Sequence, residues 1–256
     1  MPLSEESDKP SAKVTWQSRY LARFYSPPSE KWDGTRKYYQ LCARALASVE
    51  HDTRQILEVG AGPSNQSSRY LATLGTVTGL DPDPLVLTND ALTHSIVLKG
   101  QLYPFPDASF DIAVSDYVVE HLRDPLTHLS ELYRVLKVGG AYIFRTPNRF
   151  HYVPLVASLT PHWFHEAVAN RARRLPPRAH SPYPTVYAMN TARSIRRLAK
   201  SAGFTVEAID YIEGEPWYGM FSRLAFLAMM GYERLVNSRE VFAPARANLF
   251  VVLRKL

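Results

Sequence analysis

Between residues 55 and 145, short runs of β-branched and other apolar residues alternate with longer amphipathic segments. The apolar runs predict strands at 55–59, 76–80, 95–98, 110–115 and 141–145. The amphipathic segments predict helices near 65–73, 83–92 and 124–136. Strands that alternate with helices in this way are typical of a doubly wound α/β sheet in which most strands are parallel.

The regions outside this block extend one domain and do not form a second one. Residues 1–13 are polar and predicted to be disordered, because they hold too little apolar surface to offset the entropy of ordering. Residues 14–256 are expected to form a single domain. Its expected additions are a helical cap at 14–50, a basic and aromatic lid at 149–190 and an apolar helical insertion at 213–240.

Composition narrows the class of protein. Of the 256 residues, 46% are hydrophobic and 21% charged, and no uncharged apolar run reaches the length of a membrane-spanning helix. The first residues also lack an apolar signal segment, so a cytoplasmic protein is expected. The single cysteine, Cys42, excludes an intrachain disulfide and a cysteine-based zinc site.

The positive charge of the chain is concentrated in one segment. The net charge is +6, and residues 161–200 carry eight basic residues against one acid, Glu166. An anionic partner would therefore meet this segment. The alternative is that these arginines form a solvated face with no specific partner.

Residues 55–65, QILEVGAGPSN, predict a strand that breaks into a glycine turn and then enters a helix. Gly60 and Gly62 lack side chains, so a ligand can approach the backbone closely. Asp81 ends the next strand, where a carboxylate is well placed to accept hydrogen bonds from ribose hydroxyls. Asn65 occupies the third small-residue position of a dinucleotide fingerprint, which disfavours a nicotinamide oxidoreductase.

The run from Glu58 to Gly62 reads E-x-G-x-G and resembles motif I of the class I S-adenosylmethionine-dependent methyltransferases, in particular the small-molecule, ubiquinone-biosynthesis-type subgroup. Residues 103–125 and 129–148 resemble the central block of that family in order and spacing. The resemblance covers about residues 55–148 and resumes at the two ranges 190–212 and 248–255.

This resemblance implies a Rossmann-like sheet of seven strands, mostly parallel with an antiparallel last strand. Residues 190–212 would form a helix and the sixth strand, and 248–255 the antiparallel seventh. Helical insertions would follow strands five and six, and Gly139 and Gly140 would form a tight turn before the fifth strand.

The resemblance also implies S-adenosylmethionine as the cofactor and a set of residues around it. By their positions in the family motifs these are Glu58, Gly60, Ala61, Gly62, Asp81, Pro82, Gln101, Ser115 and Asp116. Asp81 would bind the ribose hydroxyls, and the backbone and side chains of Ser115 and Asp116 would approach the amino-acid moiety. Gln101 stands where many relatives have an acid that meets the adenine amine.

The chemistry expected from this cofactor is simple. The methyl group on its sulfonium is already activated, so the protein mainly aligns the acceptor atom and excludes water. An oxygen or nitrogen acceptor can also need a general base, for which His121 is the first candidate, with His162, His165, Tyr183 and Tyr187 of the insertion as alternatives. The alternative role for His121 is to cap or pack at the start of a helix. No metal is expected, because His162 and His165 lack a third ligand.

The two insertions are expected to set the acceptor, because loops on the carboxyl side of such sheets carry specificity. Their aromatic and apolar residues favour O-methylation of a glycoside, a lipid-linked sugar or a natural-product hydroxyl. The apolar helix could instead form a dimer face or lie on a membrane as a peripheral contact. The alternatives are an RNA or DNA methyltransferase that uses residues 161–200, although no NPPY-type tetrad for a flipped base is present, and a non-catalytic S-adenosylmethionine-binding protein.

Overall fold

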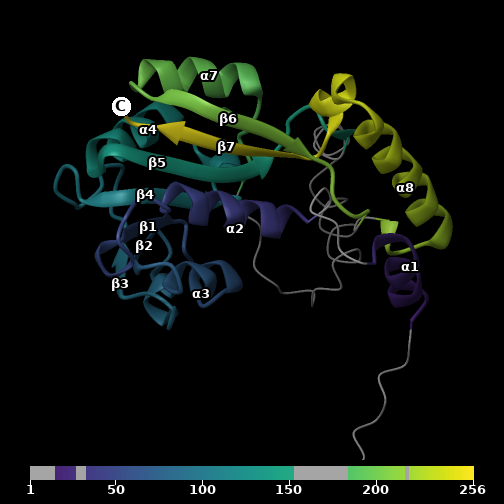
Figure 1. Ribbon diagram of the computed structural model, residues 1–256, viewed down its shortest axis with the longest axis horizontal. Coiled ribbons are helices and arrows are strands. Elements are labelled where there is room, and N and C mark those ends of the chain that lie inside the picture. The colour runs from purple at the N-terminus through teal and green to yellow at the C-terminus, as the bar shows by residue number, and fades with distance from the viewer. Residues whose placement is uncertain (1–14, 27–32, 153–183, 217–218) are drawn as a thin grey trace, which may run out of the picture.

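The structure, a computed structural model, describes residues 15–26, 33–152, 184–216 and 219–256 (Figure 1). The predicted disorder of residues 1–13 and most of the predicted lid at 149–190 lie outside these ranges. His162, His165, Glu166 and Tyr183 lie outside them as well.

A seven-stranded sheet forms the centre of the molecule, with strand order β3-β2-β1-β4-β5-β7-β6. The strands are β1 (Gln55–Val59), β2 (Thr76–Asp81), β3 (His94–Val97), β4 (Phe110–Asp116), β5 (Leu136–Pro147), β6 (Thr205–Ile212) and β7 (Asn248–Arg254). Only β7 is antiparallel, and it pairs with both β5 and β6. The predicted α/β fold class, mostly parallel with an antiparallel last strand, is confirmed.

Six α-helices are described around this sheet, together with four short 3₁₀ helices. The α-helices are α1 (Trp16–Tyr25), α2 (Gly34–Ala45), α3 (Gln66–Ala72), α4 (Pro125–Val135), α7 (Ala192–Ser201) and α8 (Arg223–Ser238). The 3₁₀ helices are η1 (His51–Thr53), η2 (Pro84–Thr88), η3 (Val119–His121) and η5 (Glu240–Ala245).

Side chains at the helix starts explain several of these boundaries. Asn65 precedes α3, and its Oδ1 accepts a hydrogen bond of 2.9 Å from the backbone N–H of Ser68. Thr191 and Ser194 form a capping box at the start of α7. The residue that breaks the dinucleotide fingerprint, Asn65, thus has a structural function as a helix cap.

Apolar residues cover both faces of the sheet. On one face, Leu129 of α4 and Ile195 of α7 pack with Tyr142 of β5 in one fully buried cluster. On the other face, Cys42 of α2 and Leu71 of α3 belong to a second cluster. Burial raises the pKa of the Cys42 thiol well above its usual range, so this cysteine is a core residue.

Two local predictions were wrong. The helix predicted at 83–92 is only the 3₁₀ turn η2, because the Asn89 side chain turns back and bonds the glycine turn after β1. The tight turn predicted at Gly139 and Gly140 is an irregular stretch within β5, which begins directly after α4. A Cβ on Gly140 would lie 2.9 Å from the backbone oxygen of Asp111, so glycine is required where β5 passes β4.

Helix α8 follows β6, where a helical insertion was predicted, and it begins at Arg223. Figure 1 shows α1 and α8 beyond the carboxyl end of β6, apart from the helices that cover the sheet. Within the described residues, no helix combines the length and the apolar character that crossing a membrane requires.

Candidate functional site

The glycine turn after β1 lies where the strand order reverses between β1 and β4, the usual ligand position in such sheets. Gly60 and Gly62 have positive φ values of 74° and 55°. A Cβ on Gly60 would lie 2.3 Å from Cγ2 of Val118, whereas a Cβ on Gly62 would meet nothing within 4 Å. Gly60 is therefore required by close packing, and Gly62 faces open space.

Glu58 is a buried acid directly before this turn, with 4% of its surface exposed. Its Oε2 has no hydrogen-bond partner within the described structure. Burial raises the pKa of Glu58 to about 7, although the neighbouring hydroxyls of Ser68 and Ser67 oppose the rise. An unpartnered, buried carboxylate oxygen is unusual and suits a donor from a ligand.

Asp81, at the end of β2, holds the turn from the side. Its Oδ2 accepts a 3.0 Å hydrogen bond from the Gly62 N–H, and its Oδ1 accepts a 2.7 Å bond from the Asp83 N–H. Burial raises the pKa of Asp81. A carboxylate has about four acceptor positions, so the side chain retains capacity for ribose hydroxyls.

Asn89 is a supporting residue that the sequence did not reveal. Its Nδ2 donates to the Gly62 backbone oxygen at 3.2 Å and to the Ser68 Oγ at 3.0 Å. Asn89 is buried, and it belongs to no motif near the glycines. No local signal identifies it, because its contacts depend on the path of the chain after β2.

Ser115, at the end of β4, differs from the expectation for its side chain. Its Oγ lies 2.6 Å from the Tyr142 Oη, and that hydroxyl lies 3.0 Å from the His128 Nε2. The His128 Nδ1 lies 2.7 Å from the Tyr103 Oη, and burial lowers the pKa of His128 to about 4. The Ser115 side chain is therefore part of a buried, neutral chain of hydrogen bonds under α4.

Asp116 points to the opposite face of the sheet and is paired there. Arg145 of β5 binds its carboxylate with two nitrogens, one of them Nη2 at 2.7 Å from Oδ2. Arg145 also donates to the Thr35 Oγ1 at 3.1 Å and lies 4.9 Å from the Tyr117 ring centre. The structure thus adds Arg145 to the site, where it neutralises Asp116 beside the start of α2.

The remaining predicted cofactor residues lie on the same edge, formed by the glycine turn and the carboxyl ends of β1, β2, β3 and β4, which we call the cofactor edge. Ala61 is buried within the turn, and Pro82 and Gln101 are exposed on the segments that follow β2 and β3. These positions agree with a ligand that extends from the glycine turn across the ends of β2 and β3.

His121, the candidate base, ends the 3₁₀ helix η3 and is half-buried. Its Nδ1 lies 3.1 Å from the Pro184 backbone oxygen. The neighbouring Glu120 is buried, and its Oε2 accepts a 2.9 Å hydrogen bond from the Thr146 Oγ1. Burial raises the pKa of Glu120. The sequence analysis missed Glu120 as a second titratable group, although it stands beside His121 in VVEHL.

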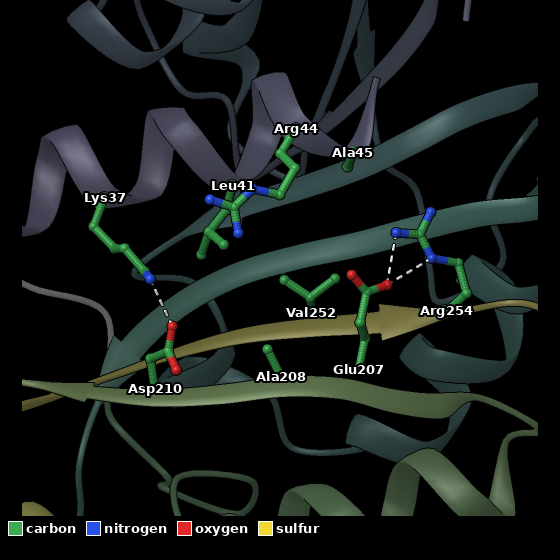
Figure 2. Close-up of a pocket in the computed structure, with 9 residues that line it drawn as sticks. All are labelled: Lys37, Leu41, Arg44, Ala45, Glu207, Ala208, Asp210, Val252 and Arg254. Atoms are coloured by element: carbon green, nitrogen blue, oxygen red, sulfur yellow. Dashed lines mark hydrogen bonds and ion pairs between the residues drawn. The ribbon is translucent and has the colours of Figure 1, made fainter. Parts of the chain in front are cut away.

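Two other features lie apart from this edge. In the described ranges, no group of three or more His, Cys, Asp or Glu residues is placed to hold a metal ion. Figure 2 shows a shallow depression between α2 and strands β6 and β7, bordered by the ion pair of Lys37 with Asp210 and that of Arg254 with Glu207. It lies over the sheet edge opposite to β2 and β3.

Comparison with known proteins identifies the domain. Residues 57–144 match the family model described as a methyltransferase domain. Residues 57–144 belong to a class I S-adenosylmethionine-dependent methyltransferase domain. The match includes the glycine turn, Asp81 and the end of β4.

Relatives of this methyltransferase domain have similar names. A probable S-adenosylmethionine-dependent methyltransferase of Mycolicibacterium smegmatis is 35% identical over 105 residues, which are 40% of this chain and 41% of the relative. A malonyl-[acyl-carrier protein] O-methyltransferase of Erwinia billingiae is 29% identical over 138 residues, 52% of this chain and 55% of the relative. The chain thus spans about half the length of the curated relatives that it matches.

The fold of the methyltransferase domain also has solved neighbours. A geranyl diphosphate methyltransferase, solved with GPP and sinefungin, has a TM-score of 0.56 at 13% identity. The superposition covers 86% of this chain and 78% of that one. At this identity the likeness concerns the fold alone.

S-adenosylmethionine is the cofactor of this class, and the residues present fit it. The buried, unpartnered Oε2 of Glu58 suits the ammonium group of the methionine moiety. The open space at Gly62 allows the ligand to lie against the backbone. The identification disfavours the nicotinamide oxidoreductase considered for the sequence.

Proposed function

We propose that this protein transfers the methyl group of S-adenosylmethionine to an oxygen atom of a small or lipid-like acceptor. The observation that carries the proposal is the glycine turn, with the partnerless Glu58 oxygen on one side and Asp81 on the other. The name of one relative, a malonyl-[acyl-carrier protein] O-methyltransferase, supports transfer to an oxygen atom.

Each residue at this edge has a proposed task in binding. Glu58 accepts hydrogen bonds from the methionine ammonium, and the backbone of Gly60, Ala61 and Gly62 lies against the same moiety. Asp81 accepts from the ribose hydroxyls while it keeps its bond to the Gly62 N–H.

The outer part of the ligand has further contacts in this proposal. Pro82 and Gln101 lie beside the adenine. The Ser115 backbone approaches the amino-acid moiety, and Asp116, held by Arg145, fixes the end of β4. When bound, the cofactor supplies a methyl group that is activated by its positive sulfur, so the protein mainly orients the acceptor and excludes water.

A hydroxyl acceptor must also lose its proton, and we assign this step to His121. When the Nδ1–H donates to the Pro184 backbone oxygen at 3.1 Å, the basic lone pair of the neutral ring lies on Nε2. Nε2 would then accept the proton of the acceptor hydroxyl, while the methyl group passes from sulfur to oxygen and S-adenosylhomocysteine would be left as the product. The test is the kcat of methyl transfer for His121→Gln at saturating S-adenosylmethionine and acceptor: a large fall in kcat, with the Tm rise by S-adenosylhomocysteine unchanged, supports this role, and an unchanged kcat contradicts it.

Ligand-dependent thermal stability tests the cofactor part of the proposal first. The purified chain is heated with S-adenosylhomocysteine and, in parallel, with NAD, because a ligand that binds only the folded state raises the Tm. We expect a rise with S-adenosylhomocysteine only, and its loss in Asp81→Asn. The matched control is Asp210→Asn, which removes a carboxylate on β6 that pairs with Lys37. Stabilisation by NAD alone would contradict the proposal.

Transfer of labelled methyl groups then tests the acceptor. The chain is incubated with labelled S-adenosylmethionine and separate lipid, small-molecule, RNA and DNA fractions. Label in the lipid or small-molecule fraction supports the proposal. Label confined to nucleic acid would support the alternative that involves residues 161–200, and cofactor binding without label in any fraction would indicate a non-catalytic binding protein.

A further inference from the structure

Helices α1 and α8, which we call the α1/α8 layer, pack together although nearly 200 residues separate them in sequence. The Phe226 ring of α8 meets the rings of Trp16, Tyr20 and Tyr25 edge-on, with centroid distances of 6.3, 5.5 and 6.3 Å. The Gln17 side chain also donates to the Met220 backbone oxygen at 3.2 Å. The aromatic face of α1 and one face of α8 are therefore used to hold the layer together.

The same contact removes the acid of α8 from the surface. Glu233 is the only acidic residue in either helix and is 1% exposed. Its Oε2 accepts a 2.7 Å hydrogen bond from the Tyr25 hydroxyl, and its Oε1 accepts a 3.1 Å bond from the Asn237 amide. The outward face of the layer thus carries no acidic side chain from α1 or α8.

The outward face of α8 is apolar. Leu224, Leu227 and Leu235 are 78%, 38% and 58% exposed, and their spacing places them on one stripe of the helix. Ala228 and Gly231 lie between them and are also exposed. A surface helix of a soluble protein normally packs such a stripe against the protein interior and exposes its polar residues. In α8 the apolar stripe faces solvent instead.

Exposed arginines accompany the stripe. Arg223 directly precedes Leu224, and Arg19 and Arg23 lie one helical turn apart on α1. Exposed arginines and an apolar stripe on one layer, with no exposed acid in α1 or α8, match the surface of an anionic bilayer, which offers phosphate groups above an acyl layer. A two-fold dimer through the same face is disfavoured, because each copy would bring its arginines to the same contact.

We propose that the α1/α8 layer binds the surface of an anionic lipid bilayer, with the leucines of α8 in the acyl boundary and the arginines at the phosphates. The layer lies beyond the carboxyl end of β6, the side of the sheet on which the cofactor edge opens (Figure 1). Bilayer binding does not depend on methyl transfer, so each proposal can fail without the other.

Co-sedimentation with lipid vesicles tests this surface. The full chain is spun with vesicles of phosphatidylcholine alone and with vesicles that also contain phosphatidylglycerol. We expect pelleting only with the anionic vesicles, and about tenfold weaker binding for Arg19→Gln/Arg23→Gln, with a strong dependence on salt. Leu224→Gln/Leu235→Gln should abolish pelleting.

The controls separate lipid binding from folding and from self-association. Val138→Gln replaces an equally exposed apolar residue on β5 and should pellet like the original chain. All variants should keep their Tm and its rise with S-adenosylhomocysteine, which shows that the fold is intact. Absence of pelleting, or equal pelleting with the neutral vesicles, would overturn the proposal. It would also be overturned by a lipid-free dimer that the leucine substitutions dissociate, since a second copy would then occupy the stripe.

Discussion

The cofactor edge and the α1/α8 layer are built in contrasting ways. At the cofactor edge, buried side chains such as Asp81 and Asn89 bond the backbone of the glycine turn and hold its shape. In the α1/α8 layer, aromatic rings join two helices and large apolar side chains remain in solvent. The comparison shows that a site that holds a ligand against the backbone needs fixed backbone geometry, whereas a contact surface can be formed by side chains on helices outside the sheet.

At the cofactor edge, the largest expected effect comes from the substitution Gly60→Ala. The added Cβ would lie 2.3 Å from Val118, and φ is +74°, so overlap and backbone strain act together. We expect a loss of about 3 kcal/mol in the free energy of unfolding and no rise in Tm with S-adenosylhomocysteine.

Two variants separate these causes. Gly62→Ala has the strain without the overlap, because nothing lies within 4 Å, and should cost about 1 kcal/mol. Gly60→Ala/Val118→Ala should recover part of the loss. Equal costs for Gly60→Ala and Gly62→Ala would show that packing against Val118 is unimportant.

Glu58→Gln should separate stability from ligand binding at the same edge. The folded-state pKa of about 7 lies above the ordinary 4.5, so between these values the folded state holds more protons than the unfolded state. Ionisation of Glu58 therefore lowers the free energy of unfolding as pH rises through this window. The loss is complete above about pH 7. At pH 8 the substitution should stabilise the ligand-free protein by up to about 3 kcal/mol, measured by urea unfolding.

Ligand binding should change in the opposite direction. The ionised Glu58 is the form that attracts the methionine ammonium, so affinity for S-adenosylhomocysteine in the original chain should increase as pH rises through about 7. Glu58→Gln should bind weakly at every pH. A variant that is more stable and still binds with the original pH dependence would remove Glu58 from the site.

In the α1/α8 layer, the largest expected effect comes from Tyr25→Phe. It removes the hydroxyl that donates to Glu233 and leaves a buried carboxylate oxygen without this donor. We expect a loss of about 2 kcal/mol in the free energy of unfolding. Tyr20→Phe keeps its ring on Phe226 and is the matched control. Equal losses for the two variants would indicate that the rings, and not the hydroxyl, hold the layer.

The smallest effect on stability is expected for Leu224→Gln in the absence of lipid. This side chain is 78% exposed, so its replacement should change the free energy of unfolding by less than about 0.5 kcal/mol. A loss of several times that size, measured by urea unfolding, would mean that the side chain packs within the protein. The contrast with Gly60→Ala would then disappear.

The sequence predicts the central sheet well because each strand contains its own signal. The runs at 55–59 and 110–115 are apolar and short, and they lie within one residue of β1 and β4. The glycines and Asp81 are also visible, since their spacing follows from the turn between consecutive elements. These features depend on residues that are close in sequence.

The features that the sequence did not reveal depend on contacts between distant residues. Asn89 reaches the glycine turn from a segment where the helical pattern suggested a continuous helix. The Ser115 side chain is hydrogen-bonded to the hydroxyl of Tyr142, which lies 27 residues away in the sequence. Phe226 of α8 is buried by aromatic residues of α1, and no local pattern relates the two helices.

The position of β7 has a consequence for the order of folding. β6 pairs with no other described strand, and β7 lies between it and β5. During synthesis, residues 205–212 therefore have no strand to pair with until residues 248–254 have left the ribosome. Helix α8 is synthesised in that interval. A nascent chain that stalls before residue 248 would expose the edge of β5, which is an apolar strand that could pair with another chain.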